Sequence, residues 1–176
     1  MADDNNLTRR ELIQITAAAA MATAGASSQA TEKAPRFFTK DEFALVDELT
    51  ELIIPTDDHS PGARAAQVAE YIDARLAESF GDQPKQKWRD GLRRIDAISQ
   101  EMHGRPFMQA TPDQRMAVLQ RISKNEQKPE LPEEQFFDRL KRDTAYAYYT
   151  SKIGIHQEME YKGNVYLQEF AGYEVK

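Results

Sequence analysis

Cysteine is absent from this sequence of 176 residues. Its absence excludes disulfides, thiolate-bound zinc, cysteine-ligated iron–sulfur clusters and a cysteine nucleophile. A chain without thiols is compatible with an oxidising compartment, because nothing in it depends on the redox state of cysteine. The fold must therefore rest on a hydrophobic core, and the length is that of a single domain.

Long basic runs and long apolar runs are also missing. Lysine and arginine total 23 against 29 acidic residues, which gives a formal net charge of −6. Phosphate binding requires a basic patch, so we expect no nucleic-acid partner. No apolar stretch is long enough for a transmembrane helix, so we expect no direct membrane span.

The common catalytic and cofactor motifs are missing as well. The sequence has no G-x-S-x-G elbow, no C-x-x-C-H haem motif and no Gly-rich dinucleotide loop. Glu133 and Glu134 are adjacent carboxylates, but they stand at an expected helix start, where negative charge complements the helix dipole. We therefore predict no catalytic residue and no cofactor on this chain.

Metal ligands are few. None of the three histidines is spaced as in H-E-x-x-H or in a Glu-x-x-His di-iron site. We predict no metal site and interpret Asp57 and Asp58 as caps or as polar contacts to a partner. The alternative is a stand-alone periplasmic helical protein that binds a metal or another ligand through the candidate residues His59 with Asp57 and Asp58, His103, and His156 with Glu158 and Glu160.

The N-terminus has the pattern of an export signal. Arg9 and Arg10 precede a short, Ala-rich, weakly apolar run, and Ala24–Ala26 is an A-x-A cleavage pattern. Paired arginines before such a run are typical of a twin-arginine signal peptide, which we assign to residues 1–26. An amphipathic helix or a general secretory signal is the alternative. The localisation that follows is the periplasm.

The predicted export route does not match the predicted chemistry of the chain. The twin-arginine route exports folded proteins, usually because a cofactor is inserted before export, and this chain shows no cofactor site. A second, cofactor-loaded polypeptide that lacks its own signal would resolve the mismatch. Residues 27–36 are polar and are predicted to form a flexible linker.

The remaining residues, 37–176, predict an all-α domain of five or six helices around one core. Apolar residues recur at helical spacing, capping boxes or prolines mark several starts, and no alternating run is long enough for a sheet. Trp88 is interpreted as a core anchor rather than a ligand-stacking residue. Five helices are expected. The first is Thr39–Ile53, and the second has an apolar stripe from Ala65 to Phe80 and ends at Gly81. The third is Pro84–Met102, the fourth opens at Thr111-Pro112 and includes Met116 to Ile122, and the fifth is Pro132–Ser151.

Two segments differ in character from the helices. Pro55 and Pro61 fix φ on either side of a short polar turn, so this turn is predicted to be rigid. The C-terminal segment from Lys152 contains regularly spaced glycines and many apolar residues, and six of the seven tyrosines lie between Tyr146 and Tyr173. This segment either completes the core or forms a partner surface, since tyrosine is favoured at interfaces.

The same motifs resemble the gluconate 2-dehydrogenase subunit 3 family, from about Phe37 to Asn164. The strongest match is I-I-P-T-D-D-x-x-P-G-A, which spans Ile53–Ala63. Tyr71-Ile72-Asp73 follows in the expected order, and the later matches are Phe137, Tyr149-Thr150-Ser151 and Tyr161–Asn164. His59 and Ser60 occupy variable positions of the first motif and carry no functional inference.

The resemblance implies a non-catalytic small subunit of a periplasmic sugar, sugar-acid, polyol or glycoside dehydrogenase. FAD and the catalytic bases would lie on a large GMC-type flavoprotein subunit, whose export, folding and stability this chain would assist. A cytochrome c subunit or another acceptor would take the electrons. A helical domain that docks on a different exported protein is the remaining alternative. The predicted partner contacts are Pro55, Thr56, Asp57, Asp58, Pro61, Gly62, Tyr149, Tyr161, Asn164 and Tyr166.

Overall fold

A computed structural model describes residues 34–163 of the chain. The chain divides into two units, residues 1–34 and 35–176, and the account below concerns the second. Its described part is helical and contains no strand. The elements are α2 (Lys40–Ile53), α3 (Val68–Glu78), α4 (Gln83–His103), the short 3₁₀-helix η1 (Phe107–Gln109), α5 (Pro112–Ile122), α6 (Pro132–Tyr149) and the π-helix η2 (Gly154–Glu158).

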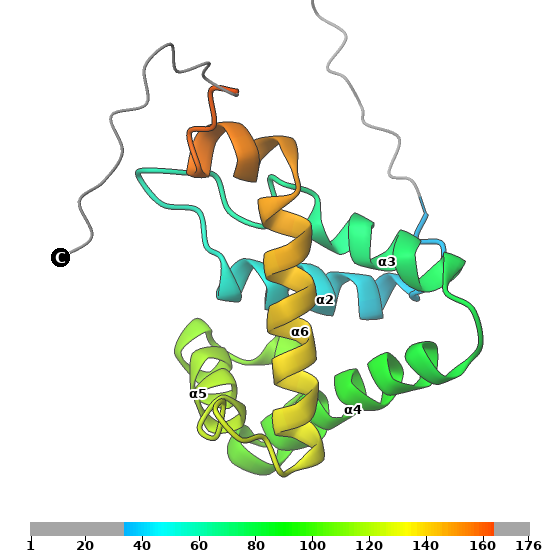
Figure 1. Ribbon diagram of the computed structural model, residues 1–176. Helices are drawn as coiled ribbons and strands as arrows, with labels where there is room; N and C mark the ends of the chain where they lie inside the picture. The colour runs from blue at the N-terminus through cyan, green and yellow to red at the C-terminus, as the bar shows by residue number, and fades with distance from the viewer. Residues whose placement is uncertain (1–33, 164–176) are drawn as a thin grey trace, which may run out of the picture. The chain divides into compact units, whose positions relative to one another are not determined.

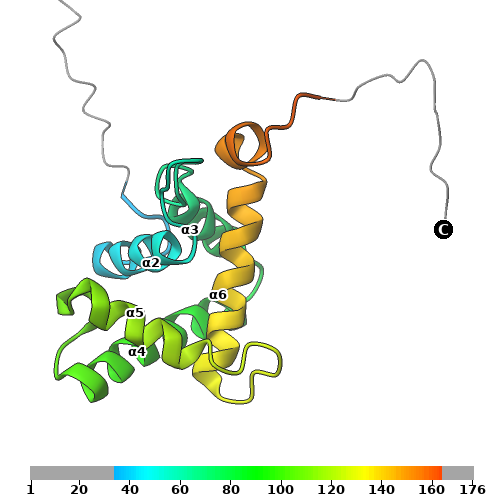
Figure 2. The same cartoon turned by 90° about the vertical axis from the view of Figure 1, so that its left-hand side faces the viewer.

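Helix α6 holds the domain together. Helices α2 and α3 pack as one pair and α4 and α5 as another, and α6 contacts both pairs. Figures 1 and 2 show α6 as a column along one side of the two pairs. The all-α prediction is confirmed for the described residues, where no helix is both long and apolar enough to cross a membrane.

Two predicted helix starts are confirmed in detail. The Thr39 hydroxyl accepts from the Glu42 amide, while the Glu42 carboxylate accepts from the Thr39 amide at 2.9 Å. Thr111 and Gln114 form the same reciprocal pair at the start of α5. Each capping box satisfies amides that the first helical turn leaves without an intrahelical partner, which explains why short sequence patterns located these starts correctly.

The predicted second helix is too long at both ends. Helix α3 begins at Val68 because Gln67 has a left-handed backbone conformation, with φ of 56°, which separates it from the preceding turn. Ala65 and Phe80 are exposed, so the predicted stripe ends at Leu76. Phe80 lies in the turn after α3, outside the helical register that would have buried it.

Smaller corrections concern two methionines and the end of α6. Met102 and Met116 were assigned to apolar faces but are more than one third exposed. Helix α6 ends at Tyr149, two residues before the predicted end, and the chain then forms η2, which the sequence did not predict. The predicted buried side of α6 is confirmed in full: Phe136, Phe137, Leu140, Thr144 and Tyr148 are all buried.

Trp88 anchors the core, as predicted. Its side chain is fully buried, and its ring meets Phe38 and Phe136 edge-on, with centroid separations of 5.9 and 5.5 Å. Edge-to-face pairs of this kind add to the free energy of burial. The three aromatic residues connect the segment before α2 with α4 and α6.

A buried carboxylate fixes the entry into α2. Asp73 on α3 is buried and accepts from the backbone amides of Arg36, Phe37 and Phe38 at 2.6, 3.0 and 2.9 Å. Three amide donors compensate for removing the charge from water. Asp73, part of the second motif, is thus a structural residue that positions Phe38 over the core.

Candidate partner-binding surface

Hydrogen bonds to Glu51 on α2 stabilise the turn between α2 and α3, residues 54–67. One carboxylate oxygen of Glu51 accepts from the amide and hydroxyl of Thr56 at 3.1 and 3.0 Å, and the other accepts from the Arg64 amide at 2.8 Å. Partial burial raises the pKa of Glu51, but these hydrogen bonds and the Arg64 charge together lower it by more. The pKa therefore lies below its ordinary value. A single charged side chain therefore holds the two halves of the turn together.

The turn leaves no room for a side chain at Gly62. A Cβ at this position would lie 2.5 Å from the Thr56 nitrogen and 2.7 Å from the Glu51 carboxylate oxygens. The Gly62 amide donates to the Thr56 hydroxyl at 2.9 Å, and the Ala63 amide donates to the Ile54 carbonyl at 2.9 Å. Only glycine permits this close approach of two backbone segments.

Asp57 folds the tip of the turn. Its Oδ1 accepts from the amides of Ser60 and His59, both at 2.8 Å, and these two bonds lower the pKa of Asp57. An aspartate that bonds amides two and three residues ahead is a recurrent turn device. Asp57 is confirmed as a capping residue, whereas the neighbouring carboxylate of Asp58 is exposed.

Tyr148 ties the turn to the end of α6. Its hydroxyl donates to the Pro61 carbonyl at 2.7 Å and lies 2.6 Å from the Ser60 hydroxyl. Both Tyr148 and Ser60 are buried, and burial raises the pKa of the Tyr148 phenol. Hydrogen bonds between uncharged groups thus join residues 54–67 to the C-terminal end of α6.

A second contact joins the turn to η2. His59 Nε2 lies 3.3 Å from the Glu158 carbonyl oxygen and 3.8 Å from a Glu158 carboxylate oxygen. Figure 1 shows the turn beside η2 at the C-terminal end of α6. Two segments that are about a hundred residues apart in sequence therefore lie side by side, and both had been predicted as partner contacts.

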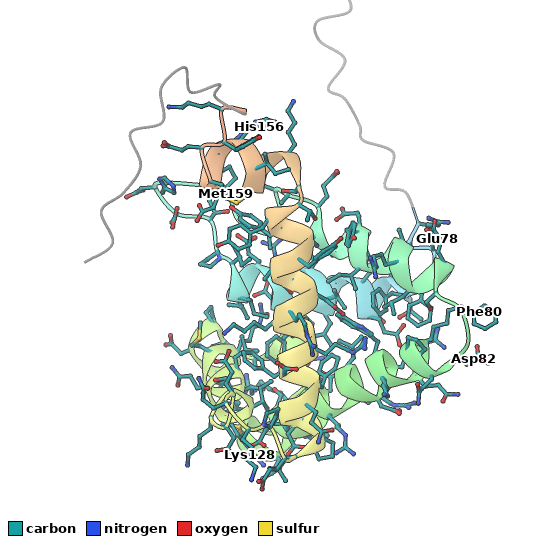
Figure 3. All side chains as sticks on the ribbon, viewed as in Figure 1. Glu78, Phe80, Asp82, Lys128, His156 and Met159 are labelled. Carbon is teal, nitrogen blue, oxygen red and sulfur yellow. The ribbon has the colours of Figure 1, made fainter. Side chains whose placement is uncertain are left out.

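The exposed atoms at this end combine carboxylates with large apolar side chains. Pro55, Thr56, Asp57 and Asp58 are exposed on the turn. Tyr149, Met159 and Tyr161 are 42, 50 and 50% exposed, and Figure 3 labels Met159, the residue that follows η2. We call this set of seven residues the turn–η2 surface.

The remaining predicted contacts have other positions. Pro61 is half-buried and Gly62 is buried, so they shape the turn rather than expose side chains. Asn164, Tyr166 and the signal residues Arg9 and Arg10 lie outside the described residues. The sequence analysis did not select Glu51, Tyr148 or Glu158 for this site. Tyr148 and Glu158 act on residues that are distant in the chain, and Glu51 looks like any other polar residue of a helix.

The histidines are not assembled into a metal site in the part of the chain that the structure describes. Residues 34–163 contain no group of three or more His, Asp or Glu side chains placed to hold a metal ion. His59 has Glu158 beside it, while His103 lies at the end of α4.

Comparison with known families identifies the chain. The model of the gluconate 2-dehydrogenase subunit 3 family matches residues 40–165, well over half of the sequence. This chain belongs to that family. No curated protein and no solved structure matched it.

Family membership makes the chain a homologue of a dehydrogenase subunit. The match extends from the start of α2 past η2 and includes the whole turn–η2 surface. The predicted range, Phe37 to Asn164, agrees with it closely.

Proposed function

We propose that this subunit 3 homologue is a non-catalytic partner of a large FAD-dependent sugar, sugar-acid, polyol or glycoside dehydrogenase subunit of the GMC type. It binds that flavoprotein through the turn–η2 surface and assists its folding, stability and export to the periplasm. FAD and the catalytic bases lie on the large subunit, and a cytochrome c or another acceptor receives the electrons.

One structural observation carries the assignment of the surface. The turn and the C-terminal segment, which the sequence singled out separately, meet through the bonds from Tyr148 to Ser60 and Pro61 and the contact between His59 and Glu158. A surface built on such bonds is preorganised, so binding loses less conformational entropy. A family whose members are subunits supplies the reason for a partner.

The chemistry of the surface favours a particular kind of complement. Tyr149, Met159 and Tyr161 offer apolar area of the kind enriched at interfaces, and Asp57 and Asp58 add negative charge beside it. The complementary patch on the large subunit is therefore expected to contain an apolar hollow with lysine or arginine at its rim.

Co-purification from the periplasm tests this function. The chain, tagged at Lys176, is expressed with its signal peptide and isolated from the periplasm, and its visible spectrum is recorded. Flavin absorbance together with a co-eluting large chain that oxidises a sugar supports the proposal. A colourless single chain that carries one equivalent of metal would overturn it in favour of the stand-alone protein.

Two matched substitutions test the surface. Met159→Glu places a charge on the turn–η2 surface, and Met116→Glu places the same charge on α5, where the methionine is 40% exposed. We expect the first variant to weaken the complex by about tenfold or more and the second to leave it unchanged. Equal affinities of the two variants for the large subunit would show that the turn–η2 surface is not part of the interface. Asp57→Ala with Asp58→Ala tests the acidic part of the turn in the same assay.

A further inference from the structure

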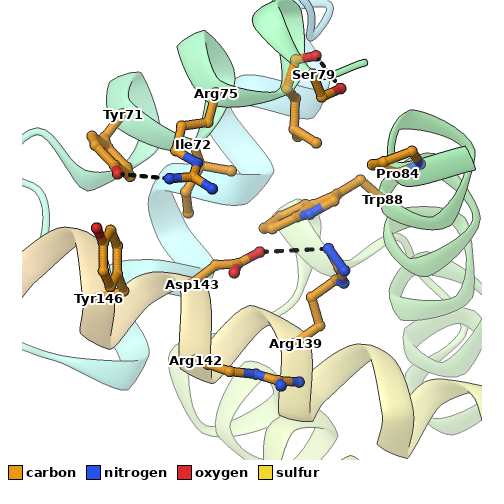
Figure 4. A pocket seen from close by; sticks show the side chains of 11 residues that line it. Tyr71, Ile72, Arg75, Ser79, Pro84, Trp88, Arg139, Arg142, Asp143 and Tyr146 are labelled. Atoms are coloured by element: carbon orange, nitrogen blue, oxygen red, sulfur yellow. Dashed lines mark hydrogen bonds and ion pairs between the residues drawn. The ribbon is translucent and has the colours of Figure 1, made fainter. Parts of the chain in front are cut away.

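A hollow is lined by residues of three helices of the domain. It is bounded by α3, α4 and α6 and has a volume of about 550 Å³. Figure 4 shows Arg75 on α3 and Arg139, Arg142 and Asp143 on α6 around it, with the buried Trp88 at its inner wall. A smaller hollow of about 410 Å³ continues it between α4 and α6, and Arg139 and Arg142 line both. We call the two together the cationic groove.

The groove is basic in an acidic protein. Five cationic side chains line it against three carboxylates, Asp90, Asp138 and Asp143, although the chain carries a net charge of −6. Such a local reversal of sign attracts an anionic group and repels a cationic one. The five cations are Arg75, Lys87, Arg94, Arg139 and Arg142.

Arg75 is held in place without a carboxylate. Its guanidinium donates to the Tyr71 hydroxyl at 3.3 Å and lies 5.9 and 5.8 Å from the ring centres of Tyr71 and Tyr146. No acidic side chain in residues 34–163 comes within ion-pair distance of it. Two aromatic rings thus orient the Arg75 charge, which Asp143 attracts only from beyond ion-pair distance, so that no carboxylate of residues 34–163 occupies the direct contact.

The two arginines that α6 contributes, Arg139 and Arg142, have only weak partners. Arg139 and Asp143 are 4.0 Å apart, and Arg142 meets Asp138 at 2.6 Å with both side chains largely exposed. Because these pairs are exposed to water and join residues four apart on one helix, an incoming carboxylate can replace them at little cost. Burial raises the pKa of Asp143, while the neighbouring arginines oppose that rise.

The shape of the groove favours an extended chain over a compact molecule. The lining residues of α6 run from Pro132 to Tyr146, a rise of about 21 Å, which about six residues of extended polypeptide would span. Exposed aromatic side chains stand beside it: Tyr146 on the α6 wall is 55% exposed, and Phe80, which follows the groove residue Ser79, is fully exposed. Tyr149, one helical turn beyond Tyr146, belongs to the turn–η2 surface, so the groove leads into it.

We propose that the cationic groove binds an extended acidic segment of the large subunit, whose carboxylates pair with Arg75, Arg139 and Arg142. This inference rests on the proposed function and adds a second contact to the same partner. The segment alternates acidic side chains with an apolar or aromatic one that packs against Tyr146 or Phe80. Because electrostatic pairs dominate this contact, it makes the stability of the complex dependent on salt concentration.

Charge reversal in the intact complex tests the groove. Arg139→Glu with Arg142→Glu is compared with Lys124→Glu and Lys128→Glu, which make the same change of charge in the exposed loop before α6. Circular dichroism first establishes that both variants keep the wild-type fold. The dissociation constant of each complex is then measured at 50 and 300 mM salt.

The groove variant is expected to weaken the complex about tenfold or more at low salt and to remove most of the dependence of the affinity on salt. The control variant is expected to stay within about twofold of the wild-type affinity. Equal affinities for the groove and control variants, with the wild-type complex intact, would overturn the groove contact alone. A groove variant that changes the oligomeric state of the isolated chain but not the complex would assign the groove to a second copy and also overturn it. Failure of the wild-type chain to bind any flavoprotein would instead overturn the proposed function itself, and the groove contact with it.

Discussion

At the scale of single residues, the domain contains two buried threonines in contrasting environments. Thr50 and Thr144 are both fully buried in helices. The Thr50 hydroxyl donates to the Asp47 carbonyl at 3.0 Å, whereas the Thr144 hydroxyl has no hydrogen-bond partner among residues 34–163. A buried polar group without a partner lowers stability, because it loses its bond to water on folding.

Thr144→Val is therefore expected to stabilise the domain. Valine keeps the shape and removes the unpaired hydroxyl, so the free energy of unfolding should rise by about 1 kcal/mol and the Tm by about 2–5 °C. Thr50→Val, the matched control, removes a formed bond and should lower stability by a similar amount. Thermal unfolding followed by circular dichroism measures both, and a loss of stability in Thr144→Val would contradict the assignment of an unpaired group.

Glu51 makes the turn sensitive to acid. Its pKa in the folded chain is below its ordinary value of 4.5, so its contribution to stability is complete above that value and is lost as the pH falls through the folded pKa. Glu51→Gln should lower the Tm by about 1–3 °C near pH 7, a small change because water screens this partly exposed group. The difference should shrink as the pH falls below 4.5 and through the folded pKa of Glu51. A difference in Tm that stays constant from pH 7 to pH 3 would show that charge is not involved.

At the scale of helices and turns, Tyr148 links the end of α6 to the turn. Tyr148→Phe keeps the ring in the core but removes the bonds to Ser60 and Pro61, and should lower the free energy of unfolding by about 1–2 kcal/mol. Amide hydrogen exchange of the turn should become faster, while α4 and α5 keep their protection. Tyr149→Phe is the control, since Tyr149 is 42% exposed. Unchanged exchange in the turn would mean that Glu51, Asp57 and the contact between His59 and Glu158 hold it without the Tyr148 hydroxyl.

The crossing of α4 and α6 depends on one glycine. A Cβ at Gly91 would lie 2.0 Å from a ring carbon of Phe136. Gly91→Ala should destabilise the domain by about 1–3 kcal/mol although alanine favours a helix, because the overlap outweighs the gain in propensity. Adding Phe136→Leu, which removes the ring, should recover part of the loss. If the two substitutions are simply additive in denaturant unfolding, the contact does not determine the crossing.

At the scale of the whole domain, α6 packs against both helix pairs, so neither pair should unfold by itself. The single tryptophan, Trp88, lies between them in the core and reports on tertiary packing. Fluorescence of Trp88 and far-ultraviolet circular dichroism should therefore give coincident urea transitions. Separate midpoints would show that one helix pair remains folded after the other has opened.

The docking surfaces also belong to this scale. The turn–η2 surface and the cationic groove are connected along the exposed side of α6, which extends from Pro132 through Tyr146 to Tyr149. A partner that used both would cover most of one side of a single helix. Such an arrangement would give a subunit for which we predict no cofactor a large contact area with the proposed flavoprotein partner.

Much of this protein was determined by its sequence alone. Helical spacing, the Thr39 capping box, the Thr111 cap followed by Pro112 and the Pro55–Pro61 turn depend on residues a few positions apart, so local physics predicts them correctly. The motif between Ile53 and Ala63, with the later matches in the expected order, indicated the family that the comparison then showed.

Tertiary structure decided the rest, because those features depend on contacts between distant residues. The left-handed Gln67 moved the start of α3 to Val68, and the end of α3 at Glu78 left Phe80 exposed in the turn that follows; no helical pattern predicts either. Asp73 became a buried anchor for Arg36 to Phe38 only when α3 packed beside them. Arg75 joined Arg139 and Arg142 in one groove only when α6 crossed α3. Charges far apart in sequence acquire a shared function when packing brings them to one surface, and spacing along the chain does not encode that.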